Sequence, residues 1–586
     1  MKKEHGSESF GVVWLIILLM ALANTFTAFA QVKQATVLVN GISCDLEQGI
    51  LKVEFVTPDV VRVQYTGENT FIGNGTDVCL PRAVDNPVRW VYTPNPDCYL
   101  LKSDSLIVRV DLSTASITYL DKEGGLLLQE DQNIPRISEK RVTKQVIYDE
   151  HSKHIEKTAD GDKEIKNVLR YDTIGHTWKY RINFKWQPLE ALYGWGAHME
   201  DYMNLRGKEL YLCQHNLKAM VPVLNSTAGY GLLFDAGCAM IFKDNSEGSF
   251  VELEAAKQID YYFMKGKTMD AVVANYRLLT GNSPMMPLYL FGYIQSKERY
   301  VSSDDLINTL KEYRQRQIPI DMIVQDWNYW PEGQWGNMSM NPKFYPDKRK
   351  LADEIHSLHA KLMISIWPNA MNCPQHEEFR RKGWLLSGTS VYDAFNPLAR
   401  KLYWNYANNE FFGNGFDAWW CDASEPLDAD WTFMKDGYGA DNHRQRWELN
   451  TNLLNSVLGA ERSQLYSLYH AKGIYENQRS TNEDKRVVNL TRSSYAGQQR
   501  YSTITWNGDT YATWQSFAQM IPAGLNFMAT GCPYWTVDIG AFFTKNGPQW
   551  FWKGDYDKGV ADMAYRELYI WSLLTGVSKS WFRYSS

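Results

Sequence analysis

Two patterns of hydrophobic and polar positions follow one another along the chain. From about residue 33 to 285, short runs rich in Val, Thr, Tyr and Ile alternate with polar positions and are broken by Gly, Pro, Asp or Asn, as in LKVEFVTPDVVRVQYTG and KYRINFKW. Alternation with a period of two is typical of antiparallel strands that bury one face. We therefore predict an N-terminal antiparallel β-sandwich over residues 31–285. The charged stretch 138–167 is expected to be a solvated excursion of this domain rather than a binding patch.

After about Pro287, apolar strand-like runs alternate with helical segments. LYLFGYIQ (288–295) precedes a segment in which Leu306, Leu310 and Tyr313 fall on one helical face, with Ser302 or Ser303 as its N-cap. The further runs are IPIDMIVQDW (318–327), KLMISIW (361–367), FDAWWCD (416–422), RVVNLTRSS (486–494), STITWNGD (502–509) and NFMATGCPYWTVD (526–538). Strands separated by helices indicate a parallel sheet buried on both faces. The predicted fold class is therefore α/β, with a (β/α)8 TIM-type barrel over residues 286–586 behind the sandwich.

Polar side chains recur near the C-terminal ends of these apolar runs. They are Asp326, Asp422, Arg492, Asp509 and Asp538, and Trp367 occupies a similar position. In a β/α barrel these strand ends converge on one face, where active sites are built. Helix N-capping is the commoner role of a single Asp after a strand, but it explains five repeats of the pattern less well. The sequence therefore predicts a polar pocket at this face of the barrel.

Composition narrows the chemistry of this pocket. The 586 residues include 22 Trp and 35 Tyr, and the net charge is −6 without a basic block. Nucleic acid and anionic membrane surfaces are therefore not expected as partners, and a small neutral partner is. The eight cysteines are scattered without a CxxC pair, and no His lies at the strand ends, which argues against a metal site. Because a GxSxG motif is also absent, paired carboxylates among tryptophans favour glycoside hydrolysis.

The N-terminus predicts a signal peptide over residues 1–30. Lys2 and Lys3 precede the apolar run GVVWLIILLMALA, and Ala28-Phe29-Ala30 supplies a small-x-small cleavage site before Gln31. The alternative is an uncleaved anchor, for which the run is short compared with the roughly 20 residues of a spanning helix. We expect export to the periplasm or secretion, without stable membrane insertion after cleavage. The sequence indicates no oligomeric state.

Several segments resemble a known family. WWCDASEP (419–426), QDWNYW (325–330), PYWTVDIGAFF (533–543) and RSSYAGQQRYSTITWNGDTYATW (492–514) resemble signature segments of glycoside hydrolase family 31, the family of α-glucosidases and α-xylosidases. YGWGAHMEDYMNLRG (193–207) resembles the sandwich domain of that family. These segments occur in the family's order and cover roughly residues 190–570. The resemblance implies a retaining exo-acting mechanism that uses no metal or organic cofactor and acts on an oligosaccharide or another α-glycoside.

The resemblance also implies roles for individual residues. Asp422 matches the family's nucleophile, and Asp509 in WNGD matches its general acid/base. The implied substrate contacts are Asp326, Trp367, Trp420, Arg492, Trp506 and Asp538, although a plain core role is equally open for each tryptophan. Glu425 either orients the nucleophile or caps a helix. We expect Asp422 to be ionised beside Arg492, and Asp509 to be protonated because an apolar setting raises its pKa.

The substrate stays open at this point. QDWNYW and WWCDASEP resemble the α-xylosidase branch more than the DIDYM and WIDMNE forms of typical α-glucosidases. A bulky Trp near the nucleophile could exclude a C6 hydroxymethyl group and so favour xylose. A hydrophobic wall discriminates one carbon group by only about 1–3 kcal/mol, so α-glucosidase and α-N-acetylgalactosaminidase activities remain alternatives.

The C-terminal end departs from the family pattern. After DMAYRELYI (562–570) the chain reads WSLLTGVSKSWFRYSS, in which the eighth strand and its histidine have no match. We therefore expect a C-terminally truncated barrel, incomplete at its last strand, without the C-terminal β domains of the family. This departure keeps open a catalytically impaired sugar-binding remnant. An α-glycan lyase, which such folds can also host, is a second rival.

Overall fold

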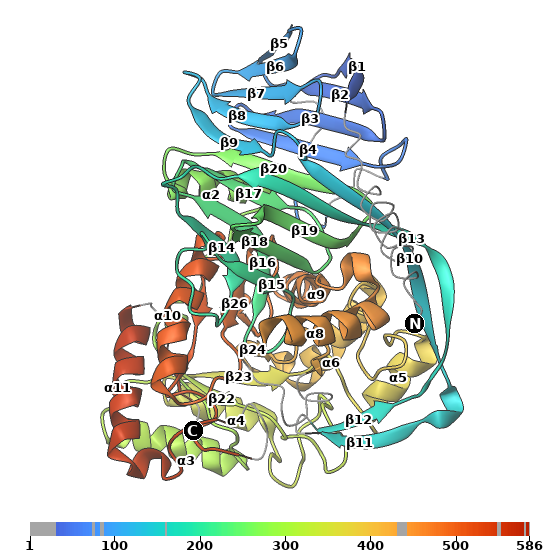
Figure 1. Ribbon diagram of the computed structural model, residues 1–586. Helices are drawn as coiled ribbons and strands as arrows, with labels where there is room; N and C mark the ends of the chain where they lie inside the picture. Colours follow the sequence, from blue (N-terminus) through green and yellow to red (C-terminus); the bar gives the residue numbers. More distant parts are fainter. Residues whose placement is uncertain are drawn as a thin grey trace, which may run out of the picture.

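A β-rich N-terminal part stands on an α/β C-terminal part in the computed structural model of the chain (Figure 1). The structure describes residues 31–72, 77–81, 87–158, 161–429, 442–547, 553–578 and 582–584. The predicted signal peptide, residues 1–30, lies outside the described residues. Within the described ranges, no helix combines the length and the apolar character that crossing a membrane requires.

Two large antiparallel sheets build the N-terminal part. In spatial order the first contains β1 (Val32–Val37), β2 (Gly41–Leu46), β3 (Ile50–Thr57), β4 (Val60–Thr66), β20 (Ile259–Lys265), β17 (Tyr230–Phe234), β16 (Ala219–Ser226) and β14 (Leu192–Ala197). The second contains β15 (Glu209–Leu212), β18 (Met240–Asn245), β19 (Gly248–Ala256), β13 (Val168–Lys185), β9 (Leu126–Glu130), β8 (Ile117–Asp121), β7 (Leu106–Asp111), β6 (Cys98–Ser103) and β5 (Trp90–Pro94), with β10 (Arg136–Tyr148) paired to β13. The predicted antiparallel β domain is confirmed.

The sandwich core follows from the alternation in the sequence. In β3 the side chains of Leu51, Val53 and Phe55 are buried, and the positions between them are partly exposed. Because successive side chains of a strand point to opposite faces, this pattern places one face of the sheet inward. Across the two sheets, the ring of Tyr119 in β8 stacks on the ring of Phe263 in β20, with centroids 4.0 Å apart. Aromatic contacts of this kind hold the sheets together.

Strands β10 and β13 continue beyond the sandwich as a two-stranded arm. They pair antiparallel, and β11 (His154–Thr158) and β12 (Gly161–Ile165) form a hairpin between them. The arm runs alongside the barrel in Figure 1. Near the end of β10, Tyr148 lies against the barrel so closely that a Cβ atom on Gly388 would be 2.8 Å from its ring. The charged stretch 138–167, expected to be solvated, thus belongs to a paired ribbon that contacts the barrel.

The C-terminal part is a barrel of parallel strands. In spatial order they are β27 (Trp535–Thr536), β26 (Thr503–Trp506), β25 (Asn489–Thr491), β24 (Ala418–Cys421), β23 (Lys361–Ile366), β22 (Met322–Gln325), β21 (Tyr293–Gln295), β29 (Phe582–Tyr584) and β28 (Asp538–Ile539). The helices of this part are α3 (Ser303–Gln315), α4 (Lys348–Ser357), α5 (Pro374–Lys382), α6 (Pro397–Glu410), α8 (His443–Leu458), α9 (Tyr466–Thr481), α10 (Trp514–Ala529) and α11 (Met563–Ser578), and α2 (Met269–Thr280) precedes them. Ser302 caps α3 by accepting a hydrogen bond from the Asp305 N–H. The predicted barrel is confirmed.

The last position of the barrel is held by a very short strand. β29 pairs in parallel with β21 on one side and with β28 on the other. Strands β27 and β28 are separated by Val537 alone and together form the seventh position. The three residues of β29 therefore occupy the position of the eighth strand, for which the sequence offers no match to the family. Backbone pairing between neighbouring strands continues through them.

A loop of the sandwich reaches the barrel. This 213–218 hairpin joins β15 to β16, and His215 and Lys218 exchange backbone hydrogen bonds across it. Arg446 of α8 donates a hydrogen bond of 2.7 Å to the carbonyl oxygen of Asn216 at the tip of the hairpin. The hairpin is thus fixed from the barrel side, which brings a residue of the N-terminal domain to the C-terminal ends of the barrel strands.

Candidate active site

Strand β24 ends at the two acidic residues of WWCDASEP. Trp420 points into the barrel, where its ring packs edge-on against Trp506 with centroids 4.8 Å apart. Trp419 points to the other side and donates from Nε1 to Gln478 in α9 at 2.7 Å. Asp422, the next residue after the strand, keeps 22% of its side chain exposed. The bulky apolar run is therefore a strand buried on both faces, and its carboxylate emerges at the tip.

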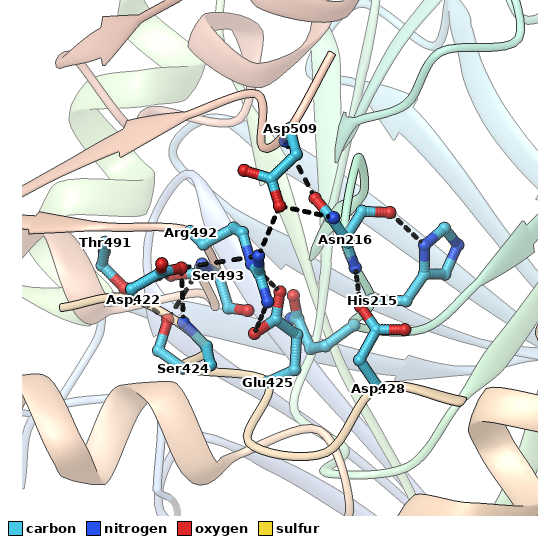
Figure 2. A network of polar contacts seen from close by, with 12 residues as sticks. His215, Asn216, Asp422, Ser424, Glu425, Asp428, Thr491, Arg492, Ser493 and Asp509 are labelled. Atoms are coloured by element: carbon cyan, nitrogen blue, oxygen red, sulfur yellow. Dashed lines mark hydrogen bonds and ion pairs between the residues drawn. The ribbon is translucent and has the colours of Figure 1, made fainter. Parts of the chain in front are cut away.

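The side chain of Arg492, which follows β25, joins three carboxyl groups (Figure 2). Its Nε and Nη2 atoms contact the two oxygens of Glu425 at 2.6 and 3.3 Å. Its Nη1 atom lies 3.4 Å from Asp422 Oδ1 and 3.0 Å from Asp509 Oδ2. Two acids separated widely in sequence therefore approach the same nitrogen atom.

Two of the carboxyl groups around Arg492 have raised pKa values. Burial raises the pKa of Asp509 to about 8; the positive charge of Arg492 opposes this rise, and the negative charges of Asp422 and Asp538 add to it. Burial likewise raises the pKa of Glu425 to about 7, against the opposing charge of Arg492. Burial of Asp509 and Glu425 therefore favours the neutral form of these two carboxyl groups, against the single positive charge of Arg492.

Sequence reasoning missed Asn216 at the tip of the 213–218 hairpin. Its amide nitrogen donates to Asp509 Oδ2 at 2.9 Å, and its amide oxygen accepts from the Asp509 N–H at 3.0 Å. Asn216 lies in a short turn with no motif around it, 293 positions from its partner. No signal in a single sequence points to such a pair.

The remaining predicted residues lie at or near the same strand ends. Asp326 directly follows β22 and is 6% exposed, and Trp367 directly follows β23. Trp367 packs edge-on against Trp330, with ring centroids 5.3 Å apart. Asp538 is fully buried in β28 and acts on Asp509 through its charge.

The structure thus joins Asp422, Glu425, Arg492 and Asp509 by direct contacts, and places Trp420 and Trp506 in the barrel core.

Glu425 is tied to the guanidinium rather than to a helix end. Its side chain is fully buried and both of its oxygens contact Arg492. Its link to Asp422 therefore passes through Arg492. Among the described residues, no group of three or more His, Cys, Asp or Glu side chains lies close enough to hold a metal ion.

The family models match both parts of the chain. The model described as "Glycosyl hydrolases family 31 TIM-barrel domain" matches residues 283–584, and "Glycosyl hydrolase 31 N-terminal galactose mutarotase-like domain" matches residues 50–242.

Individual relatives agree with these matches. An alpha-xylosidase from Saccharolobus solfataricus is 32% identical over 506 residues, which are 85% of this chain and 63% of that protein. An uncharacterized family 31 glucosidase of Pseudescherichia vulneris is 31% identical, over 63% of this chain and 69% of its own length. A crystal structure of a GH31 alpha-xylosidase from a soil metagenome, complexed with xylose, has the same fold, with a TM-score of 0.75 at 24% identity over 94% of this chain and 77% of that one. The barrel model alone spans more than half of the sequence, and the chain belongs to glycosyl hydrolase family 31.

Proposed function

We propose that the protein is a retaining, exo-acting α-glycoside hydrolase with Asp422 as nucleophile and Asp509 as general acid/base. The observation that carries this proposal is the shared contact of both carboxyl groups with Arg492 Nη1, at 3.4 and 3.0 Å. Two oxygens this close to one atom are close to each other. Such proximity is compatible with the roughly 5–5.5 Å between the carboxyl groups of retaining enzymes.

The reaction proceeds in two balanced steps. In the first, the Asp422 carboxylate attacks the anomeric carbon, while Asp509 transfers its proton to the glycosidic oxygen and the leaving group departs as an alcohol. In the second, the Asp509 carboxylate removes a proton from water, which attacks the anomeric carbon and releases Asp422. Two inversions at this carbon give a product that keeps the α configuration, and Asp509 ends protonated as it began.

The assignment of the two roles is supported by their surroundings. Asp509 has a pKa of about 8 and is therefore a competent proton donor at neutral pH. Asp422 accepts a hydrogen bond of 2.7 Å from the Ala423 N–H on the same oxygen that faces Arg492. These two contacts fix the orientation of the Asp422 carboxyl group beside Arg492.

Xylose is the proposed sugar at the reacting position. Indole rings gather beside Asp326, where Trp327 packs on Trp335 with centroids 6.1 Å apart and Trp335 in turn lies 6.3 Å from Trp367. An apolar wall of this kind favours a sugar without the C6 hydroxymethyl group. The Saccharolobus relative is named an alpha-xylosidase, but this chain spans 63% of it, and α-glucosidase or α-N-acetylgalactosaminidase activity remains the alternative.

A screen of 4-nitrophenyl α-glycosides tests this function. We expect kcat/KM for the α-xyloside to exceed that for the α-glucoside by roughly 10–200-fold, the range that one carbon group provides in an apolar pocket. Released nitrophenolate gives the rate, and the Asp422→Asn variant excludes a contaminating enzyme. If no α-glycoside reacts, a sugar-binding remnant is the better account. An unsaturated product that absorbs in the ultraviolet would instead indicate a lyase.

Two further points rest on the sequence. We propose that residues 1–30 direct export to the periplasm or secretion, with cleavage before Gln31. We also propose that the sandwich domain extends over residues 31–285 and the catalytic barrel over residues 286–586.

A further inference from the structure

The 213–218 hairpin places an amide directly against the carboxyl group of Asp509. Asn216 Nδ2 donates to Asp509 Oδ2 at 2.9 Å, and the Asp509 N–H donates to Asn216 Oδ1 at 3.0 Å. A backbone N–H can only donate, so the second bond fixes the orientation of the amide. The group that faces the Asp509 carboxyl is therefore the NH₂ end of Asn216.

The same carboxyl oxygen also faces Arg492. Asp509 Oδ2 lies 3.0 Å from Arg492 Nη1, so two donors converge on it. A guanidinium and an amide NH₂ have no acceptor capacity, and a proton on Oδ2 would point at one of them. When Asp509 is neutral, its proton is therefore on Oδ1. Figure 2 shows this other oxygen turned away from Asn216, on the side where Asp422 lies.

We propose that Asn216 is a positioning residue of the reaction, which together with Arg492 keeps the acidic proton on Oδ1 of Asp509, the oxygen that faces the glycosidic bond. The proposal rests on the function proposed above, because it assigns Asp509 as the general acid/base. It gives the N-terminal domain a part in catalysis through a contact that is made with the acid itself.

The surroundings of Asn216 hold it rigidly in this place. Its side chain and backbone are 5% exposed, its N–H donates to Asp428 Oδ2 at 3.0 Å, and its carbonyl oxygen accepts from Arg446 at 2.7 Å. On the barrel side, a Cβ atom at Gly508 would lie 2.4 Å from Asn216 Oδ1. Gly508 also has a φ of +80°, which favours glycine. The absence of a side chain at Gly508 thus allows Asn216 to approach the backbone beside Asp509 closely.

A plain joint between domains is the competing explanation. Such a joint needs complementary shape, and it would not depend on which atom of Asn216 is a donor. The two explanations differ in the titration of Asp509. A donor to the carboxylate stabilises its charged form, so its loss raises the pKa of the acid. The other charged groups that act on Asp509 are Arg492, Asp422 and Asp538, with Glu425 one contact further away, and the substitutions below leave all of them in place.

The test compares the pH dependence of kcat/KM for Asn216→Asp, Asn216→Ala and the unaltered protein. Asn216→Ala removes the donor without adding a charge. Asn216→Asp keeps the size of the side chain and the acceptor for the Asp509 N–H, but it also places a second carboxyl group beside Asp509, whose negative charge raises the pKa of the acid further. We expect the basic limb, near pH 8 in the unaltered protein, to move upward by about one pH unit in Asn216→Ala, the equivalent of one hydrogen bond to a charged group, and to move further in Asn216→Asp because of the added negative charge. We also expect kcat/KM to fall by roughly 10- to 100-fold for a methyl or sugar leaving group, and by less for 4-nitrophenol.

Asn245→Ala is the matched control, because Asn245 is an exposed residue of the same domain at the end of β18. An unchanged basic limb, with equal losses for all leaving groups, would reduce Asn216 to a joint between domains. Infrared titration of the carboxyl C=O band in Asn216→Ala and the unaltered protein measures the same shift without turnover. An inactive protein with a shifted carboxyl titration would reject the hydrolase function and keep the Asn216–Asp509 coupling, so the two failures are distinguishable.

Discussion

Replacing Asp422 by Asn is expected to lower kcat for α-glycosides by roughly 10⁴-fold or more, as loss of a nucleophile does in other covalent enzymes. The amide has the shape of the carboxylate but cannot form the glycosyl ester. The fold should persist, because the side chain is partly exposed and the Asp422 N–H bond to the Ile366 carbonyl is unaffected. Release of nitrophenolate from 4-nitrophenyl α-xyloside gives the loss, and thermal unfolding verifies the fold.

Asp353→Asn is a suitable control, because it makes the same chemical change at an exposed position on α4. We expect this variant to keep its activity. Near-normal turnover in Asp422→Asn would contradict the role of Asp422 as nucleophile. Added azide sharpens the test in Asp422→Ala, where it can enter the space of the missing carboxylate. One displacement by azide gives a β-glycosyl azide, which proton NMR identifies.

Asp509→Ala is expected to act according to the leaving group. A general acid contributes roughly 10²–10⁴-fold, so kcat/KM should fall by this factor for methyl or sugar leaving groups. For 4-nitrophenyl glycosides, whose leaving group needs little protonation, kcat/KM should change far less, while kcat falls because water is no longer activated. Steady-state kinetics on both substrate types measure the difference.

Azide again separates the roles, since in Asp509→Ala it attacks the glycosyl-enzyme and should give an α-glycosyl azide. The opposite configurations expected from the two variants make them controls for each other. Equal losses of kcat/KM on both substrate types, without azide rescue, would contradict the role of Asp509 as general acid/base.

Much of the fold follows from the sequence because burial of strands produces regular patterns of apolar positions. Period-two alternation as in β3 predicted the antiparallel domain, and continuous apolar runs such as FDAWWCD predicted strands buried on both faces. The C-terminal ends of parallel strands meet on one face. Polar residues after such runs could therefore be placed together before their contacts were known, and Asp422, Arg492 and Asp509 do lie in contact.

Contacts between distant segments produce no such pattern in the sequence. Asn216 belongs to a turn of the sandwich, and its pairing with Asp509 depends on how the 213–218 hairpin is held by α8. Strand alternation implies that Trp419 and Trp420 face opposite sides, but only the position of α9 decides which of them lies inside the barrel. The charge of the 138–167 stretch suggested solvent exposure, whereas the long antiparallel register of β10 and β13 makes it a ribbon beside the barrel.

Mass spectrometry after incubation with a 5-fluoro-α-xylosyl fluoride tests the central claim most directly, because fluorine beside the ring oxygen slows release of a glycosyl-enzyme. We expect the mass of the protein to rise by one fluoroxylosyl group, and the peptide that bears this group to contain the ester at Asp422. The label should be absent from Asp422→Asn. An ester at Asp509 or Glu425, or turnover by a protein that never carries a sugar, would contradict the account.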